Sequence, residues 1–479
     1  MKQPDPPNWH DTAHGTAALS VAAARVWTPD TLASVQRQRL ARLLRHAQAS
    51  SAFYRRTLRG LDPDTTPLQA CPVVHKATLM QHFSAWVTDD ALSLPAVQAF
   101  GAMPDRIGDD FIGSQGRYAV WESSGSRGRP GWFVHDAGAM AVYDALEQQR
   151  PAPLRPLQRW LDPFWLGERV AFVGATDGHF ASQASLQRLR RHAPWLASQW
   201  VGVSMLQPLP ELLAALQRFA PTILATYPTA AALLAGAVAD GRLRLSLREV
   251  WTGGETLADT QRARITAAFG CPLRNSYGAS EFLPIAAECA HGALHVNADW
   301  VLVEPVDAHG RPAPPDTLSH TTLLTNLANR VQPLIRYDLG DRIRVHRQRC
   351  ACGSVLPVID VLGRCDDLLS LAGPGGRAVD LLPLAVSTVL EDQAGLYDFT
   401  LEQLGPSTLR LTVPSAGPEA AAAAGAVRAL QRLAADQGAR PVSVQVRTAT
   451  HLPRGRSGKL RRITAQGAAV AQAPKRPSR

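Results

Sequence analysis

The sequence predicts an α/β protein with a large N-terminal domain and a small α+β C-terminal domain. Between about residues 118 and 330, short apolar runs alternate with amphipathic segments, which favours largely parallel sheets. The last hundred residues alternate again in a compact β-α-β pattern. With 479 residues, 46% of them hydrophobic and 19% charged, the chain has a globular composition and can bury a sizeable core.

Each predicted element follows from its own pattern. Residues 1 to about 75 are expected to be helical, because Leu32, Leu40, Leu43 and Leu44 fall near one face of a helix over 31–48. The most apolar window, 230–238, is expected to be a core helix. The predicted strands of the central region are 170–175, 222–228, 248–255 and 321–327, and its predicted helices are 210–220 and 257–270.

A loop rich in glycine and proline at 373–376 follows the segment GRCDD (363–367), so we place a domain boundary near Asp366. The resulting units are an N-terminal domain over 1–365, a C-terminal domain over 366–470 and a basic tail over 471–479 that we expect to be disordered. In the second unit, strands are predicted at 398–404, 407–413 and 442–449, with a helix over 419–435.

Composition narrows the class of protein. The first ten residues lack the basic and apolar stretches of a signal peptide, and no run is long enough to span a membrane, so a cytoplasmic protein is expected. Six cysteines are too few for a disulfide scaffold in a chain of this length. The net charge of +10 attracts polyanions such as nucleotides, coenzyme A, acidic carrier proteins or nucleic acid, unless it serves solubility alone.

Six separated segments carry groups suited to a nucleotide. A Ser/Gly/Arg loop at 122–130 can wrap phosphate oxygens with N–H groups, hydroxyls and guanidinium groups. Paired glycines in TGGE (252–255) allow close approach of a ligand. In RNSYGASEF (274–282), Tyr277 offers a flat face for a purine and Glu281 a ligand for Mg²⁺. Asp341 of RYDLGD (336–341) could accept hydrogen bonds from two ribose hydroxyls. Lys459 lies in a basic glycine-containing loop at 452–462. The sixth segment is LGRCDD (362–367).

Each segment alone has an ordinary explanation, but together and in this order they resemble the acyl-adenylate-forming superfamily, and within it the phenylacetate-CoA ligase-like branch. The resemblance covers roughly residues 30 to 465, and TGGE, YGASE, IRYDLGD, GRCDD and the terminal GK are its most specific parts. It implies stacked α/β sheets in the N-terminal domain, a mobile C-terminal domain, and ATP, Mg²⁺ and a thiol acceptor as reactants and cofactors.

The resemblance also implies roles for individual residues. Lys459 would contact the substrate carboxylate and the α-phosphate, Glu281 would bind the Mg²⁺, and Asp366 would be the hinge of the C-terminal domain. The residues implied to bind the nucleotide are Ser123, Ser124, Gly125, Ser126, Gly128, Gly253, Gly254, Glu255, Asn275, Ser276, Tyr277, Gly278, Asp341 and Arg364. The chain departs from the family pattern at Arg127 and Arg129, where many members have a Thr-rich loop ending in Lys-Pro, so the phosphate contacts could differ.

The acid is expected to lie near five residues placed by motif position. These are His179, Tyr227, Trp251, Ala279 and Phe282. Aromatic walls suit a flat aryl acid, and the same branch favours acids such as phenylacetate or benzoates. For His179 a core histidine is the competing interpretation.

Four further residues could bind zinc. Cys350 and Cys352 form a close thiol pair, and Cys289 is followed by His291 and His295; three thiols and one imidazole would complete a tetrahedral structural site. Ordinary reduced cysteines are the alternative. Matching elements in some phenylacetate-CoA ligase-like proteins favour His295 as the histidine ligand, with His291 second.

The leading hypothesis is therefore an aryl-acid ligase that uses CoA, with a small carboxylic acid as substrate. Transfer to the phosphopantetheine arm of an acidic acyl carrier protein is the close alternative. A basic nucleic-acid-binding protein would need clustered cations with interleaved aromatics or a zinc-finger spacing, and the sequence has neither. Retained Glu281, Asp341 and Lys459 argue against a catalytically dead scaffold, and the family branch implies a possible homodimer.

Overall fold

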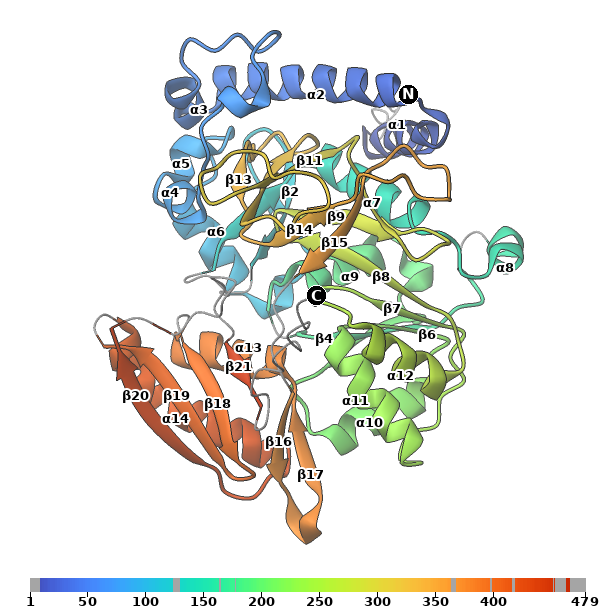
Figure 1. The fold of residues 1–479 in the computed structure, drawn as a ribbon, viewed down its shortest axis with the longest axis vertical. Coiled ribbons are helices and arrows are strands. Elements are labelled where there is room, and N and C mark those ends of the chain that lie inside the picture. The colour runs from blue at the N-terminus through green and yellow to red at the C-terminus, as the bar shows by residue number, and fades with distance from the viewer. Residues whose placement is uncertain are drawn as a thin grey trace, which may run out of the picture.

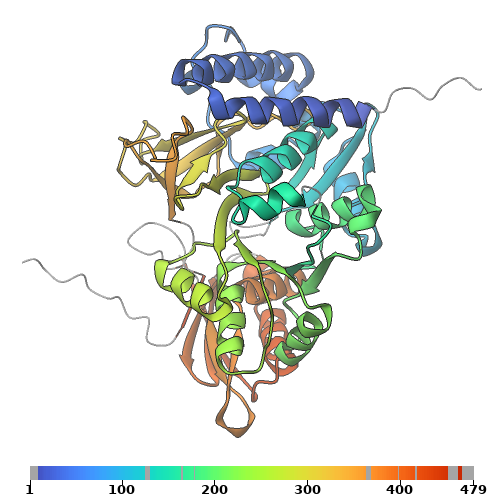
Figure 2. The same cartoon turned by 90° about the vertical axis from the view of Figure 1, so that its right-hand side faces the viewer.

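The computed structural model describes residues 9–123, 130–162, 165–176, 178–362, 368–396, 399–415, 418–450, 452 and 462–465. Three clusters of buried apolar side chains form its core, two in the larger N-terminal part and one in the C-terminal part. In both views the C-terminal part lies at the end of the molecule opposite the N-terminal helices (Figures 1 and 2). None of the helices within these ranges has the length and apolar character that crossing a membrane requires.

Between residues 9 and 101 the chain is mainly helical. The helices α1, α2 and α3 lie at the top of the molecule, and α4, α5 and α6 lie below them along one side (Figure 1). Thr28 caps the second helix by accepting a 3.2 Å hydrogen bond from the Thr31 N–H, and Pro29 occupies its first turn. Leu32, Leu43 and Leu44 are buried in this helix, which confirms the predicted face. The helices are α1 (Trp9–Ala23), α2 (Pro29–Ser50), α3 (Ala52–Thr57), α4 (Lys76–Gln81), α5 (Phe83–Trp86) and α6 (Leu94–Gly101).

A nine-stranded sheet with the order β14-β15-β10-β9-β8-β7-β6-β4-β5 runs through the N-terminal part. Strands β5, β4, β6, β7 and β8 are parallel, and the other four are antiparallel, so the prediction of largely parallel sheets holds for one half of this sheet. The strands are β4 (Val170–Gly174), β5 (Trp200–Ser204), β6 (Ile223–Thr226), β7 (Glu249–Thr252), β8 (Leu273–Ala279), β9 (Phe282–Glu288), β10 (Leu294–Val296), β14 (Arg342–Val345) and β15 (Val358–Leu362).

Helices cover both faces of the parallel half. One face packs against α10, α11 and α12 through Ala171, Val173, Leu224, Val250 and Leu273, which share a core cluster with these helices. Side chains at the alternate positions of each strand point to the other face, which bears α9. The helices are α7 (Ala137–Gln149), α8 (Pro156–Leu161), α9 (Ala181–His192), α10 (Leu209–Phe219), α11 (Pro228–Ala239) and α12 (Asp259–Phe269). The predicted helices at 210–220, 230–238 and 257–270 are confirmed.

Two small antiparallel sheets complete the N-terminal part, with the orders β1-β2-β3 and β11-β12-β13. Their strands are β1 (Phe111–Ile112), β2 (Arg117–Glu122), β3 (Trp132–His135), β11 (Val301–Val306), β12 (Thr321–Asn326) and β13 (Tyr337–Asp338). The pair β2–β3 flanks the Ser/Gly/Arg loop, and β13 begins the RYDLGD segment, so both sheets position predicted site residues.

The C-terminal part has a core of its own, built around Phe399, Leu411 and Leu430. It contacts the N-terminal part through Gln437, whose Nε2 donates 2.8 Å hydrogen bonds to the carbonyls of Leu206 and Gln207. Its elements are β16 (Leu369–Ala372), β17 (Ala378–Leu381), α13 (Pro383–Ala394), β18 (Thr400–Gly405), β19 (Thr408–Pro414), α14 (Pro418–Asp436), β20 (Ser443–Ala449) and β21 (Ile463–Thr464). The boundary near Asp366 stays a prediction, since residues 363–367 lie outside the described ranges.

Candidate functional site

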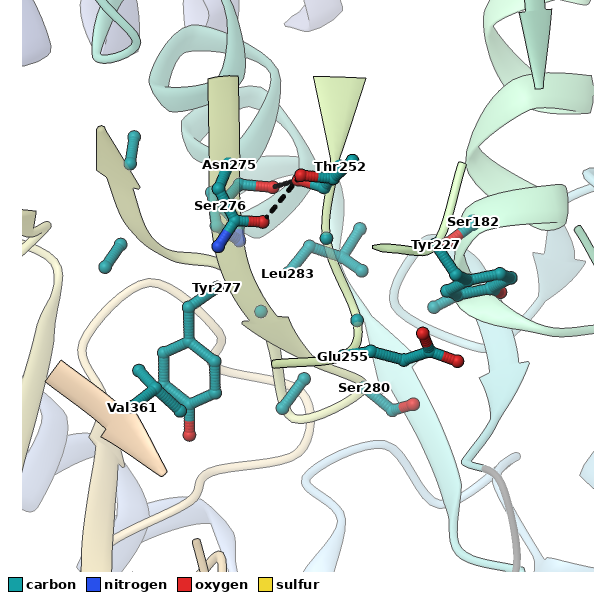
Figure 3. A pocket seen from close by; sticks show the side chains of 18 of the residues that line it. Ser182, Tyr227, Thr252, Glu255, Asn275, Ser276, Tyr277, Ser280, Leu283 and Val361 are labelled. Atoms are coloured by element: carbon teal, nitrogen blue, oxygen red, sulfur yellow. Dashed lines mark hydrogen bonds between the residues drawn. The ribbon is translucent and has the colours of Figure 1, made fainter. Parts of the chain in front are cut away.

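A cavity of about 2630 Å³ lies at the carboxyl ends of the parallel strands and extends along their inner face. Segments from β2, β7, β8, β13 and α13 reach it. It brings together described residues from five of the six predicted segments: Ser123, the glycines of TGGE, the YGASE segment, Asp341 and Arg462. Figure 3 shows Tyr277 beside Val361 at one end, Tyr227 near Ser182 at the other, and Glu255 and Ser280 between them.

Tyr277 and Asp341 are in direct contact. The Tyr277 hydroxyl donates a 2.8 Å hydrogen bond to Asp341 Oδ2, and both residues line the cavity. The Asp341 backbone carbonyl accepts a 2.8 Å bond from Thr322 Oγ1 on β12, which fixes the end of the RYDLGD segment. An aromatic face and a carboxylate side by side match the base and the ribose of one nucleoside.

Glu281 is buried at the turn between β8 and β9. Burial raises the pKa of its carboxyl group, while a hydrogen bond from Tyr337 and the charge of Lys76 act in the opposite direction. The sequence-based prediction did not include Lys76 or Tyr337, although both line the cavity. A lysine that begins a short helix gives no signal at the sequence level, whereas Tyr337 lies within a recognised segment.

The described ends of the Ser/Gly/Arg loop are held together at its base. Ser123 Oγ accepts a 2.8 Å hydrogen bond from the Gly131 N–H, and the Ser123 N–H donates to the Gly131 carbonyl, also at 2.8 Å. Ser124, Gly125, Ser126 and Gly128 lie outside the described residues, as do Arg364, Asp366 and Lys459.

The TGGE segment forms the floor of the cavity where β7 ends. Gly254 has a φ of +79°, and a side chain there would meet the Tyr227 ring at 2.9 Å, so glycine is required. Glu255 accepts hydrogen bonds from the N–H and the hydroxyl of Thr229, in the first turn of α11. This helix-capping role accounts for part of its hydrogen-bonding capacity.

Three more of the predicted nucleotide-binding residues line the same cavity. Asn275 Oδ1 lies 2.9 Å from Thr252 Oγ1, and Ser276 Oγ donates a 3.3 Å bond to the Thr252 carbonyl. At Gly278 any side chain would collide with the Leu283 carbonyl, within the irregular pairing of β8 and β9.

Two of the five residues expected near the acid do not line the cavity. His179 is buried, with Nε2 3.1 Å from the Met103 carbonyl and its ring against Phe100. Phe282 is fully buried against Tyr143, because alternation along β9 turns it to the core side. Tyr227, Trp251 and Ala279 do line it.

Cys289, His295, Cys350 and Cys352 converge, with their ligand atoms all within 4.8 Å of one another. Cys289 Sγ lies 3.7 Å from Cys350 Sγ, and Cys352 Sγ lies 3.3 Å from His295 Nε2. His295 Nδ1 is 2.9 Å from the Leu356 carbonyl, so Nε2 faces the thiols. His291 is exposed and approaches Cys289 only through its backbone N–H. Of the two candidate histidines, His295 is therefore the one whose imidazole belongs to this cluster.

Arg462, three residues after Lys459, forms a buried ion pair with Glu391. Arg462 Nη1 donates a 2.6 Å hydrogen bond to Glu391 Oε1 on α13, and its guanidinium group lies over Phe399. Arg462 also lines the cavity. The described chain on the carboxyl side of Lys459 is thus anchored beside the site.

Comparison with known proteins gives one family match and one shared fold. Residues 197–318 match the model of the AMP-binding enzyme family. Protein CapK of Staphylococcus aureus is 30% identical over 135 residues, which make up 28% of each chain, so this chain spans under a third of that curated relative.

A 2-hydroxyisobutyryl-CoA ligase has a similar fold. In its complex with 2-HIB-AMP and CoA in the thioesterification state, the TM-score is 0.57 at 19% identity, over 92% of this chain and 91% of that one. An open conformation of the same ligase gives 0.51 at 20% identity, over 89% and 90%. Residues 197–318 thus resemble AMP-binding enzymes in sequence, and the chain as a whole shares the fold of this ligase.

Proposed function

We propose that this protein activates a carboxylic acid with ATP and transfers the acyl group to a thiol. In the first step a carboxylate oxygen attacks the α-phosphorus, a P–O bond forms, and pyrophosphate leaves with the bonding electron pair. In the second step a thiolate attacks the acyl carbon, and AMP leaves as the C–O bond to its phosphate breaks. The products are a thioester, AMP and pyrophosphate.

One observation carries the proposal: groups suited to a base, a ribose, a divalent cation and a phosphate chain lie around one cavity, although the sequence separates them by more than two hundred residues. Tyr277 touches Asp341, Glu281 lies near both, and the Ser123–Gly131 base of the Ser/Gly/Arg loop faces the same space. Such convergence positions two reactants, which supplies much of the rate enhancement of a bimolecular reaction.

Attack of an anion on a polyphosphate requires positive charge where negative charge accumulates. Lys76 lies within the cavity, and we assign Lys459 to the α-phosphate and the carboxylate, with Arg364 beside the ribose and Asp366 as the hinge of the C-terminal domain. Glu281 has the oxygen chemistry that Mg²⁺ prefers, and its buried carboxyl group would hold the ion. The Mg²⁺ would neutralise charge on the phosphates.

Aromatic residues along the inner face of the sheet support an aryl acid. The Phe172 and Tyr227 rings meet edge to face with centroids 6.4 Å apart, and Trp251 packs against Trp165 at 5.2 Å. All four line the cavity. Flat apolar walls of this kind favour a ring over a long flexible chain.

The net charge of +10 supports CoA as the acceptor, and the solved ligase with the similar fold was crystallised with CoA. An acidic carrier protein would be attracted by the same charge. An assay that offers both acceptors separates the two.

We further propose that the Cys289–His295–Cys350–Cys352 cluster holds a structural zinc ion. Two thiolates bound to a tetrahedral zinc at about 2.3 Å lie about 3.8 Å apart, which the observed Cys289–Cys350 separation of 3.7 Å matches. The four protein ligands would close the coordination shell, so the ion would pin loops together and take no part in the reaction.

Acid-dependent exchange of pyrophosphate into ATP tests the first step. We expect exchange with benzoate and phenylacetate to be faster than with long-chain fatty acids, and Lys459→Ala to reduce it by about 10²- to 10³-fold. Lys475→Ala, in the basic tail, is the matched control and should exchange as the wild type does. Failure of every acid to support exchange contradicts acid activation, and equal or faster exchange with fatty acids contradicts the aryl preference.

A further inference from the structure

The inner face of the parallel sheet carries two rows of side chains that line the cavity at different depths. Tyr227 and Gly253, which directly follow β6 and β7, form the outer row together with Ser276 of β8. Two residues earlier in each strand, Ala225, Trp251 and Arg274 form a deeper row of hydrogen-bonded neighbours. Phe172 of β4 extends this deeper row.

The spacing of the rows gives the cavity a length scale. A parallel strand rises about 3.3 Å per residue, so the rows are roughly 7 Å apart. This is about the length of one aromatic ring with its carboxylate. An acid whose carboxylate lies beside Gly253 and Tyr227 would therefore bring the opposite end of its ring to the level of Trp251 and Arg274.

Arg274 is a costly residue at this depth. Within the described ranges its guanidinium group has no hydrogen bond or ion pair, and it lies over the Trp251 ring at 4.0 Å. Burial lowers the pKa of Arg274 to about 10, although the carboxylates of Glu249 and Glu147 act in the opposite direction. Glu249 is already bonded to Arg155 and Trp251. Arg274 is half-buried, and a partly desolvated cation without a bonded partner carries a free-energy cost that a ligand with an acceptor group would reduce.

Other donors around the same deep part of the cavity also lack partners. The guanidinium nitrogens of Arg159 have no hydrogen-bond acceptor among the described residues, although Asp162 is 3.8 Å away, and the group stacks on Trp165. Trp200 Nε1 and Ser185 Oγ are likewise buried without a described partner. All of these residues line the cavity. The deep end is therefore rich in donors, which is the complement of an oxygen acceptor.

We propose that the acid substrate carries an oxygen-bearing group at the end opposite its activated carboxylate, and that Arg274 is the specificity-determining residue that binds it. Glu147 also lines this deep part and is accessible from it. A hydroxyl group fits best, because it can accept from Arg274 and donate to Glu147. The inference rests on the proposed acid activation and refines its substrate class.

The test compares acids of nearly equal shape in the pyrophosphate-exchange assay. We expect the wild-type kcat/KM for 4-hydroxybenzoate to exceed that for 4-methylbenzoate by roughly 10- to 100-fold, as for a hydrogen bond to a charged group. Arg274→Met should bring the ratio close to one, mainly by loss of 4-hydroxybenzoate exchange. Arg264→Met, an exposed arginine on α12 at the opposite face of the sheet, should leave the ratio unchanged.

Terephthalate tests the nature of the oxygen group. If the wild type prefers terephthalate to 4-methylbenzoate and Arg274→Met loses this preference, the proposal is also supported. The group that Arg274 binds would then be a second carboxylate of the substrate. Equal or better use of 4-methylbenzoate by the wild type overturns it, even if Arg274→Met fails to fold. If instead no acid supports exchange, the proposed activation is what fails.

Discussion

Tyr277 and Asp341 show how single residues define the end of the cavity that we assign to the nucleotide. They are 64 positions apart in the sequence, and their side chains are joined by a 2.8 Å hydrogen bond at the edge of the cavity. The bond holds the ring and the carboxylate in a fixed relation, so a nucleoside would meet a preorganised surface. Removal of the Tyr277 hydroxyl should let the ring and the Asp341 carboxylate move independently, while the aromatic face remains.

We therefore expect Tyr277→Phe to raise the KM for ATP by roughly 2- to 10-fold, the loss expected for one hydrogen bond, with kcat little changed. Pyrophosphate exchange at varied ATP concentration measures it. Tyr143→Phe is a matched control, because that buried hydroxyl accepts a 2.8 Å bond from Asn326 and lies outside the cavity. It should lower the melting temperature and leave the KM for ATP unchanged; the reverse pattern would contradict the assigned role of Tyr277.

At the scale of elements, the thiol cluster joins strands that the sequence separates widely. Cys289 follows β9, His295 lies on β10, and Cys350 and Cys352 lie in the loop between β14 and β15. These four strands form the antiparallel half of the nine-stranded sheet. A bound ion would thus tie this half to the loop that precedes β15.

We expect freshly purified protein to contain one zinc ion per chain. His295→Ala should abolish it and lower the melting temperature by several degrees, since about 1 kcal/mol corresponds to a few degrees in a domain of moderate size. His291→Ala is the matched control and should retain the zinc. Elemental analysis and thermal melting are the measurements. Full zinc content in His295→Ala, or none in the wild type, would refute the site.

At the scale of the whole molecule, acidic groups meet where the C-terminal part approaches the cavity. Glu122, the last residue of β2, has its pKa raised to about 7 by burial and then by the nearby Asp392 and Glu391 of α13. Glu391 is bonded to Arg462. Ionisation of Glu122 places like charges on the two parts of the chain and disfavours their approach.

The sign of the pH effect follows from this shift. Between the ordinary value of 4.5 and about 7, the folded protein binds a proton at Glu122 that the unfolded chain has lost, so stability falls as pH rises through this window. Glu122→Gln removes this contribution, and its melting temperature should gain on the wild type as pH rises from 4.5 to 7 and then level off. Glu211→Gln, exposed on α10, should show a constant difference. A constant difference for Glu122→Gln as well would contradict the prediction.

Local sequence patterns determined much of the fold. The apolar runs at 170–175, 222–228 and 248–255 contain β4, β6 and β7, and the segments predicted as helices at 210–220, 230–238 and 257–270 overlap with α10, α11 and α12. Strand and helix periodicity is a property of neighbouring residues, so it can be read without the tertiary structure. The order of the motifs along the chain and the chemical types of the residues in the Cys289–His295–Cys350–Cys352 cluster were equally accessible from the sequence.

Only the tertiary structure decided which side chains meet. His295 rather than His291 faces the thiols, because the pairing of β10 with β15 sets its direction. His179 and Phe282 turn into the core. For Phe282 the reason is its place on β9, since a shift of one residue reverses the face on which a strand residue lies. Lys76 reaches the cavity through packing between distant segments, and no local pattern indicates this. Arg274 begins the recognised segment RNSYGASEF, but that pattern does not show that its side chain lines the cavity. Contacts across long separations depend on how whole elements stack, which the local sequence does not encode.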